Sequence, residues 1–360
     1  GDDPVLAHYR LRDDDPYQVV RLFPTDEKDG VFEGTIPGNY FGELGFQYYV
    51  TGGGEESEFV FPEGDPETPQ YMPAWTGVTM TNFDFTPPAA QTYAMMGIPF
   101  VAGASQGAIL TGAMGPYDPS QWRFGRWDPT QSRYLEFPNT PEFAPGIGYW
   151  LIQREPRSIP VNGTSTSTFG GVTISLKPGW NMIATPYAFP ILWSDVTRGP
   201  NVEDRLVARS GGSYVDVTVM NPWQGYWVNN TALIDQLITI PPTMAPVKSG
   251  ESIVAEAPAK ANDHLWEIVL GAARGDRSDP RNVAAISPQA SDGVDREDYH
   301  EPPAMPGDVS LCFEVEDGDR VHTLSSDVRA EFVTGQAWDA VLRVEGGGPV
   351  RVAVAELRHL

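Results

Sequence analysis

The chain has 360 residues, and 48 Asp and Glu against 24 Lys and Arg give it a net charge of −24. Such an acidic chain repels phosphate backbones and anionic lipid headgroups, which argues against nucleic-acid binding and against a basic membrane anchor. Hydrophobic residues make up 41% of the sequence, enough for a sizeable core, yet no apolar run is long enough for a transmembrane helix. We therefore expect a folded protein without a nucleic-acid partner and without membrane insertion.

Residues 1–65 contain short segments in which apolar and polar residues alternate, separated by turn signals such as Asp13–Pro16. Such alternation is typical of half-buried strands, so this segment predicts a small antiparallel β-sandwich. The expected strands are Ala7–Leu11, Gln18–Leu22, Val31–Pro37 and Phe46–Val50. With Gly30 ahead of a strand, then Ile36-Pro37 and Gln47–Val50, the segment resembles fibronectin type III and immunoglobulin-like modules of secreted bacterial proteins.

The middle of the chain contains an internal repeat, because three landmarks recur in the same order. The matched pairs are Tyr93–Phe100 with Trp180–Tyr187, Phe124–Phe137 with Val207–Val217, and Pro145–Ile152 with Pro222–Val228. We expect two domains, 70–165 and 166–245, that fold alike from five or six short strands each and pack as a pseudo-symmetric pair. Their Gly-Tyr-Trp segments predict strands with core aromatics. Leu176–Ile183 and the Pro-Gly-x-Gly-Tyr-Trp segment at Pro145–Trp150 resemble a recurrent module of large secreted bacterial proteins, and that resemblance implies no activity.

Residues 260–360 predict a C-terminal β-sandwich with a long acidic loop, Gly275–Gly307. The expected strands are Leu265–Leu270, Val309–Phe313, Val328–Val333, Trp338–Val344 and Val350–Leu357. The segments Gly275–Asn282, Ala290–Asp295 and Glu301–Pro303 resemble the C-terminal region of the same secreted proteins. Such a domain commonly precedes a sorting module or an immunoglobulin-like module of the flagellar-hook-capping type. This resemblance implies an extracellular or cell-surface protein of a bacterium.

Candidate catalytic residues are few. Gly103–Gly107 matches the G-x-S-x-G pattern of a nucleophile elbow, with Ser105 as the nucleophile. An elbow needs a strand before it, a helix after it and a following acid and His, but Gly112 and Gly115-Pro116 would end a helix early. The preferred interpretation of Ser105 is therefore a small-residue loop. The five histidines (His8, His264, His300, His322 and His359) show no zinc-binding spacing, and the single Cys312 is read as a small buried residue.

The acidic loop is a candidate metal site. Asp276, Asp279, Asp292 and Asp295 crowd this loop, and oxygen-rich loops of this kind bind Ca²⁺. There is no EF-hand pattern, and a solvated acidic loop neutralised by nearby arginines is the preferred alternative. Ca²⁺ is the only cofactor that the sequence suggests.

Aromatic residues are the second candidate site. Trp122 and Trp127 flank Arg123 and Arg126, and we expect these two rings to be the exposed ones that could stack on sugar rings of a polysaccharide. The Gly-Tyr-Trp pairs are read instead as core.

The sequence as a whole predicts an all-β protein of several small antiparallel β-sandwich or barrel-like domains in tandem, with a duplicated module. The expected function is non-catalytic: a structural or interaction protein outside a bacterial cell, a surface, stalk or fibre subunit that binds itself or other surface proteins. The alternative is a carbohydrate-binding accessory region of a secreted hydrolase. Edge strands of sandwiches, such as the alternating segment Pro349–Leu357, are the expected points of self-association.

Overall fold

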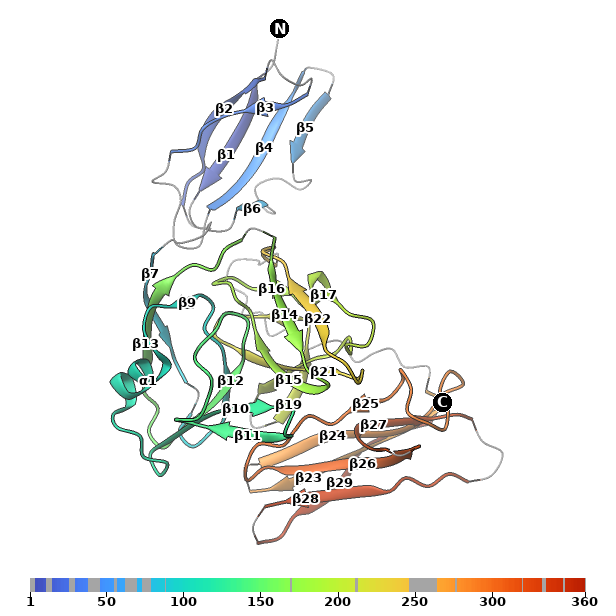
Figure 1. Ribbon diagram of the computed structural model, residues 1–360. Helices are drawn as coiled ribbons and strands as arrows, with labels where there is room; N and C mark the ends of the chain where they lie inside the picture. Colours follow the sequence, from blue (N-terminus) through green and yellow to red (C-terminus); the bar gives the residue numbers. More distant parts are fainter. Residues whose placement is uncertain are drawn as a thin grey trace.

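The computed structural model describes residues 4–10, 15–25, 30–37, 46–54, 57–61, 70–72, 79–87, 89–168, 170–210, 213–245, 264–275, 277–318, 320–331, 335–345 and 347–359. The regular elements of these residues are strands, apart from one α-helix, α1 (Gln106–Met114), and one short 3-10 turn, η3 (Trp193–Asp195). The predicted all-β fold class is confirmed. Figure 1 shows an N-terminal sheet at one end, a central unit of several small sheets, and a C-terminal sheet at the other end.

The N-terminal part forms one curved sheet. Its strands run in the order β3-β2-β1-β4-β5, and β6 pairs with β4 beside β5, so the described residues form a single sheet rather than the two facing sheets of a sandwich. Alternate residues of β1 (Val5, Ala7 and Tyr9) are buried on one face with Phe46, whereas Tyr49 lies on the other face, where it stacks on His8. The strands are β1 (Val5–Arg10), β2 (Gln18–Pro24), β3 (Phe32–Glu33), β4 (Phe46–Gly54), β5 (Ser57–Phe61) and β6 (Gln70–Met72).

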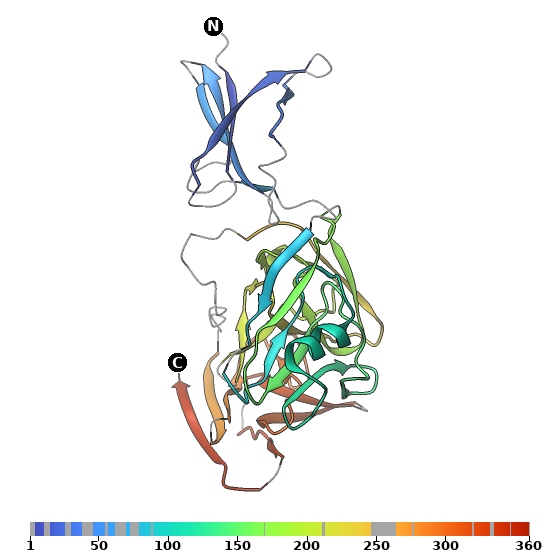
Figure 2. The ribbon, with the colours of Figure 1, turned by 90° about the vertical axis from the view of Figure 1, so that its left-hand side faces the viewer.

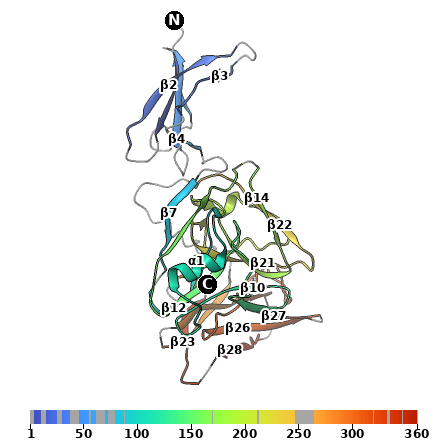
Figure 3. The same ribbon diagram turned by 60° about the vertical axis from the view of Figure 1, so that its left-hand side comes forward.

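The first half of the central unit, at the position of the first predicted repeat, contains two sheets. A four-stranded sheet has the order β11-β10-β12-β8, and a three-stranded sheet has the order β7-β13-β9. Helix α1 contacts β13 and lies on an outer face (Figure 3). The strands are β7 (Thr79–Phe85), β8 (Ala94–Met96), β9 (Val101–Ala102), β10 (Trp122–Asp128), β11 (Arg133–Glu136), β12 (Tyr149–Gln153) and β13 (Ile159–Thr164).

The second half repeats this arrangement in the same strand order. Its four-stranded sheet is β19-β18-β21-β15 and its three-stranded sheet is β14-β22-β17, and β16 and β20 form an additional pair. This agreement supports the duplication predicted from the sequence. The strands are β14 (Val172–Leu176), β15 (Gly179–Ala184), β16 (Ile191–Leu192), β17 (Thr197–Arg198), β18 (Leu206–Ser210), β19 (Ser213–Val217), β20 (Val219–Met220), β21 (Gly225–Asn230) and β22 (Gln236–Ile240).

The Gly-Tyr-Trp strands β12 and β21 form the centre of both halves. Successive side chains of a strand point to opposite faces. Tyr149 and Tyr226 therefore pack into the separate cores of the first and second halves, while Trp150 and Trp227 point the other way into one shared cluster. All four rings are fully buried, as expected from the sequence.

The C-terminal part is a seven-stranded sheet with the order β28-β26-β27-β24-β23-β29, in which β25 pairs with β27. The pairs are antiparallel except β24 with β27, which run parallel. The predicted loop over Gly275–Gly307 is wrong in part, because the apolar run Val283–Ile286 lies buried at the end of β24. The strands are β23 (Trp266–Arg274), β24 (Arg277–Ile286), β25 (Tyr299–His300), β26 (Val309–Asp317), β27 (Arg320–Arg329), β28 (Ala340–Val344) and β29 (Arg351–His359).

The C-terminal sheet packs against the central unit, as Figure 2 shows from a second direction, and β19 contacts β24. Met305, from the segment before β26, is 1% exposed and completes the shared cluster of Trp150 and Trp227. The C-terminal part therefore covers the seam between the two central halves. Cys312 is buried in β26, as predicted. No helix among the described residues is long and apolar enough to cross a bilayer.

Candidate functional site

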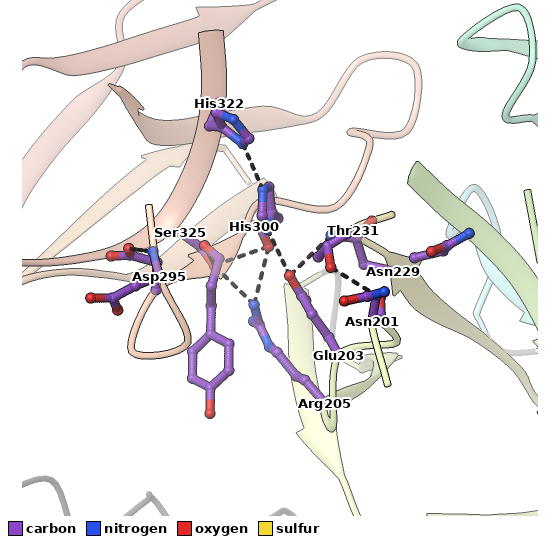
Figure 4. A network of polar contacts seen from close by, with 12 residues as sticks. Asn201, Glu203, Arg205, Asn229, Thr231, Asp295, His300, His322 and Ser325 are labelled. Carbon is purple, nitrogen blue, oxygen red and sulfur yellow. Dashed lines mark hydrogen bonds and ion pairs between the residues drawn. The ribbon is translucent and has the colours of Figure 1, made fainter. Parts of the chain in front are cut away.

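A network of polar side chains joins the central unit to the C-terminal sheet (Figure 4). It consists of Glu203 and Arg205, ahead of and at the start of β18, with His300 of β25 and His322 and Ser325 of β27. Strand pairing places the two histidines together, since His300 lies opposite Leu324, two residues after His322. This contact could not be predicted from the sequence, because 22 residues separate the histidines.

Hydrogen bonds connect the members of this network. Nδ1–H of His300 donates to Glu203 Oε1 at 2.6 Å, and Nε2 of His300 shares a hydrogen bond of 3.0 Å with Nδ1 of His322. Asn229 Nδ2 also donates to Glu203 Oε1, at 3.0 Å. Burial, together with the neighbouring His300, lowers the pKa of His322 below its ordinary value. The histidine pair is therefore a directional link between two parts of the fold.

Arg205 makes a second link. Its Nε donates to Asp216 Oδ1 at 2.5 Å, while NH1 reaches across to the carbonyl oxygen of His300 at 3.2 Å and to Ser325 Oγ at 3.0 Å. One guanidinium thus holds a central strand hairpin and the C-terminal sheet in a fixed relation. Removing the partners of the Arg205 guanidinium would lower the stability of the fold by several kcal/mol, because its charge would be left buried without a partner.

A third link centres on the carboxylate of Asp308, which is 8% exposed. It accepts from Arg209 of the central unit and from Arg277 of β24, each at 2.7 Å. Tyr214 also donates its hydroxyl to the carbonyl oxygen of Pro303 at 2.7 Å. Because Met305 lies between these contacts in sequence, apolar and polar interactions fix the same segment against the central unit.

A groove opens beside the Asp308 link, with a volume of about 540 Å³. It is lined from the central unit by Tyr93, Arg123 and Arg154, and from the C-terminal sheet by Arg277. Arg123 forms a two-pronged ion pair with Glu136. The groove could not be predicted from the sequence, because its lining residues come from four separate parts of the chain.

The predicted aromatic platform of Trp122 and Trp127 is not formed. Trp122 is only 3% exposed and packs against Tyr117 and Phe137. Trp127 lies on the other face of β10, where it packs against Tyr134 and Trp227. The expectation that these rings are exposed is wrong because both faces of β10 are covered, so neither ring offers a flat open surface to a sugar.

The predicted calcium residues do not gather in the part of the chain that the structure describes. Asp276 lies outside the described residues. Asp279 accepts from the main-chain nitrogen of Leu311 at 2.6 Å within the sheet. Asp295 accepts from the main-chain nitrogens of Ser291 and Glu297 in its own turn, whereas Asp292 Oδ1 lies 3.5 Å from Gln336 Nε2. Among the described residues no three His, Cys, Asp or Glu side chains are grouped to hold a metal ion.

Ser105 caps a helix. Its Oγ accepts from the main-chain nitrogen of Ala108 at 3.3 Å, and its backbone is extended, as is usual at the first position before a helix. The strand and helix that an elbow needs are present as β9 and α1, and α1 ends at Gly115. The hydrogen bond of Ser105 serves the helix.

Comparisons with known proteins give no relative: no family model, no curated protein and no solved structure matches this chain.

Proposed function

We propose that this chain is a non-catalytic structural and interaction protein outside a bacterial cell, which assembles with copies of itself through the free edges of its sheets. The observation that carries the proposal is the position of β29. This strand lies at the edge of the C-terminal sheet and has no strand partner, among the described residues, on the side away from β23.

The exposed surface of β29 supports this role. Val352, Val354 and Leu357 are 49%, 57% and 62% exposed, respectively. An edge strand with unpaired N–H and C=O groups and exposed apolar side chains is a template for pairing with another chain. Proteins that stay monomeric usually protect such an edge with Lys, Pro or a covering loop.

The N-terminal sheet ends in β3 and β5, which have no further strand partner among the described residues. Phe32, Phe59 and Phe61 on these strands are exposed. The N-terminal and C-terminal sheets lie at opposite ends of the molecule in Figure 1. Contact between unlike ends of successive copies would give an open filament rather than a closed ring. The net charge of −24 opposes assembly, so salt should strengthen it by screening the repulsion.

The contacts between the central and C-terminal parts suit a structural role, because three polar links and Met305 hold the two parts together. The alternative function, a carbohydrate-binding accessory region, lacks the aromatic platform on which we based it. Assembly is therefore the function that we propose first.

The test compares two Lys substitutions at exposed apolar positions. Val354→Lys places a charge on the free edge β29, whereas Leu237→Lys makes the same change on β22, a strand that is bonded on both sides. We expect light scattering in about 0.5 M NaCl, where the Debye length is about 4 Å, to show association of the wild type and of Leu237→Lys. Val354→Lys should remain monomeric under the same conditions. Equal association of both variants would contradict the assignment of β29 as the contact.

A further inference from the structure

The groove beside the Asp308 link carries an inference that is independent of self-assembly. We propose that it is a binding site for an anionic sugar, a carboxylated or sulfated unit of an acidic polysaccharide, held by Arg154 together with Arg123 and Arg277.

Charge is the first argument. Arg123, Arg154 and Arg277 all line the groove, and Arg209 lies behind Arg277 on the same carboxylate. Among the described residues, Glu136 pairs with Arg123, and Asp308 pairs with Arg209 and Arg277. Three guanidinium groups on the wall of one groove favour a negatively charged ligand.

The second argument is that polar groups in the groove lack partners. The guanidinium of Arg154 makes no hydrogen bond or ion pair with another described residue, and it is exposed to the groove. Tyr93 lines the groove, and its hydroxyl makes no hydrogen bond to another described residue. This hydroxyl can therefore bond to water or to a ligand in the groove. Arg277 lies over the Tyr93 ring at 5.4 Å, so the ring and the cations form one surface.

The shape and lining indicate a sugar rather than a simple ion. A volume of about 540 Å³ lies within the range of small-molecule sites and is far more than one inorganic anion fills. Gln91, Gln121 and Ser120 add neutral groups that can donate to and accept from sugar hydroxyls. Gln91 has a φ of +57°, a left-handed conformation that non-glycine residues rarely adopt. Its main-chain nitrogen donates to Gln153 O at 2.7 Å, which fixes this strained residue at the rim.

The experiment is calorimetric titration of the full chain with four probes: trigalacturonate, a sulfated galactose oligomer, neutral galactotriose and sodium sulfate. We expect at least one anionic oligomer to bind, with an affinity that falls as NaCl rises. Arg154→Ala should weaken this binding by about tenfold, the effect of one charged hydrogen bond, and Arg154→Lys by less. The matched control is Arg133→Ala, which removes an exposed arginine of β11 paired with the far end of β10 and should leave the affinity unchanged.

Several outcomes would overturn the proposal. They are the absence of binding by both anionic oligomers, equal binding of galactotriose, or an equal effect of Arg154→Ala and Arg133→Ala. Binding of sodium sulfate as tight as that of the oligomers would also overturn it, because it would mean a simple anion site only. Binding of only one anionic oligomer would support the proposal and identify the charged group as carboxylate or sulfate. Light scattering on the same samples measures self-assembly separately.

Discussion

Gly97 and Ala184 meet where the two halves of the central unit touch. They are matched in the repeat predicted from the sequence, and a Cβ atom on Gly97 would lie 2.1 Å from the Cβ of Ala184. Around this point the main chains bond reciprocally: Gly97 N donates to Trp223 O at 3.2 Å, and Ala184 N donates to Gly146 O at 2.9 Å. The two halves therefore meet about a pseudo-twofold contact that only a very small residue permits.

The first prediction concerns this contact. Gly97→Ala should lower the free energy of unfolding by about 2 kcal/mol, because the added methyl overpacks a site with no room to relax. Urea denaturation followed by tryptophan fluorescence measures the change. The control, Gly112→Ala in α1, meets no atom within 4 Å and should stabilise the protein by about 0.5–1 kcal/mol. Equal effects of both substitutions would mean that the halves do not touch at Gly97.

The second prediction concerns the packing of the C-terminal part on the central seam. Met305→Ala should cost about 3 kcal/mol, because it removes a fully buried side chain from the cluster of Trp150 and Trp227. Hydrogen exchange should show faster opening of the segment around Pro303. Leu233→Ala, at a residue that is 70% exposed, should change stability by less than about 0.5 kcal/mol. Unchanged exchange around Pro303 in Met305→Ala would contradict the packing.

The third prediction concerns pH. Burial, and to a lesser extent the Asp279 carboxylate, raises the pKa of Glu301 to about 8. The folded state therefore holds a proton that the unfolded state releases, and stability should fall as pH rises from about 5 to 8, by up to about 1.4 kcal/mol per unit. Glu301→Gln, a neutral side chain of the same shape, should flatten this decline.

The measurement is urea denaturation between about pH 7.5 and 8.5, above the ordinary histidine pKa of 6.5 and above the lowered pKa of His322 in the folded protein, so that His322 is largely neutral in both states. Below this range the lowered pKa of His322 makes stability fall as pH falls, because the unfolded state takes up the proton first. Glu316→Gln removes an exposed carboxylate of β26 and should keep the wild-type slope. A wild-type slope in Glu301→Gln would show that its carboxyl is ionised at neutral pH.

The fourth prediction concerns Ser105. Because its Oγ caps α1, Ser105→Ala should destabilise the protein by about 1 kcal/mol, whereas Ser105→Gly should cost only a few tenths. Thermal unfolding followed by circular dichroism measures both variants. A loss of stability in Ser105→Ala below about 0.3 kcal/mol would contradict a capping role.

The sequence predicted the features that local patterning controls. Alternation predicted a strand at Ala7–Leu11, which is β1 (Val5–Arg10), and the apolar run Val309–Phe313 lies in β26 (Val309–Asp317). The matched Gly-Tyr-Trp segments predicted the two buried central strands. The all-β class follows from such local signals. The candidate sites could not be predicted in the same way, because they depend on contacts between distant segments.

Three residues illustrate that limit. Trp122 was expected to be exposed because arginines follow it, but β10 is covered on both faces, and sequence alternation does not reveal the second covering layer. Val283 begins a buried apolar run inside a segment that we predicted to be a loop because of its charged residues. Arg154 follows a core strand and carries no motif, yet strand pairing places it in the groove with residues from the C-terminal sheet.

The most direct test of the proposed assembly is the mass of the protein in solution. Sedimentation equilibrium of the wild type, over a concentration series at low and high NaCl, should give a weight-average mass that rises above the 39.4 kDa of one chain as salt and concentration increase. A mass of 39.4 kDa under every condition would contradict self-assembly through the free edges.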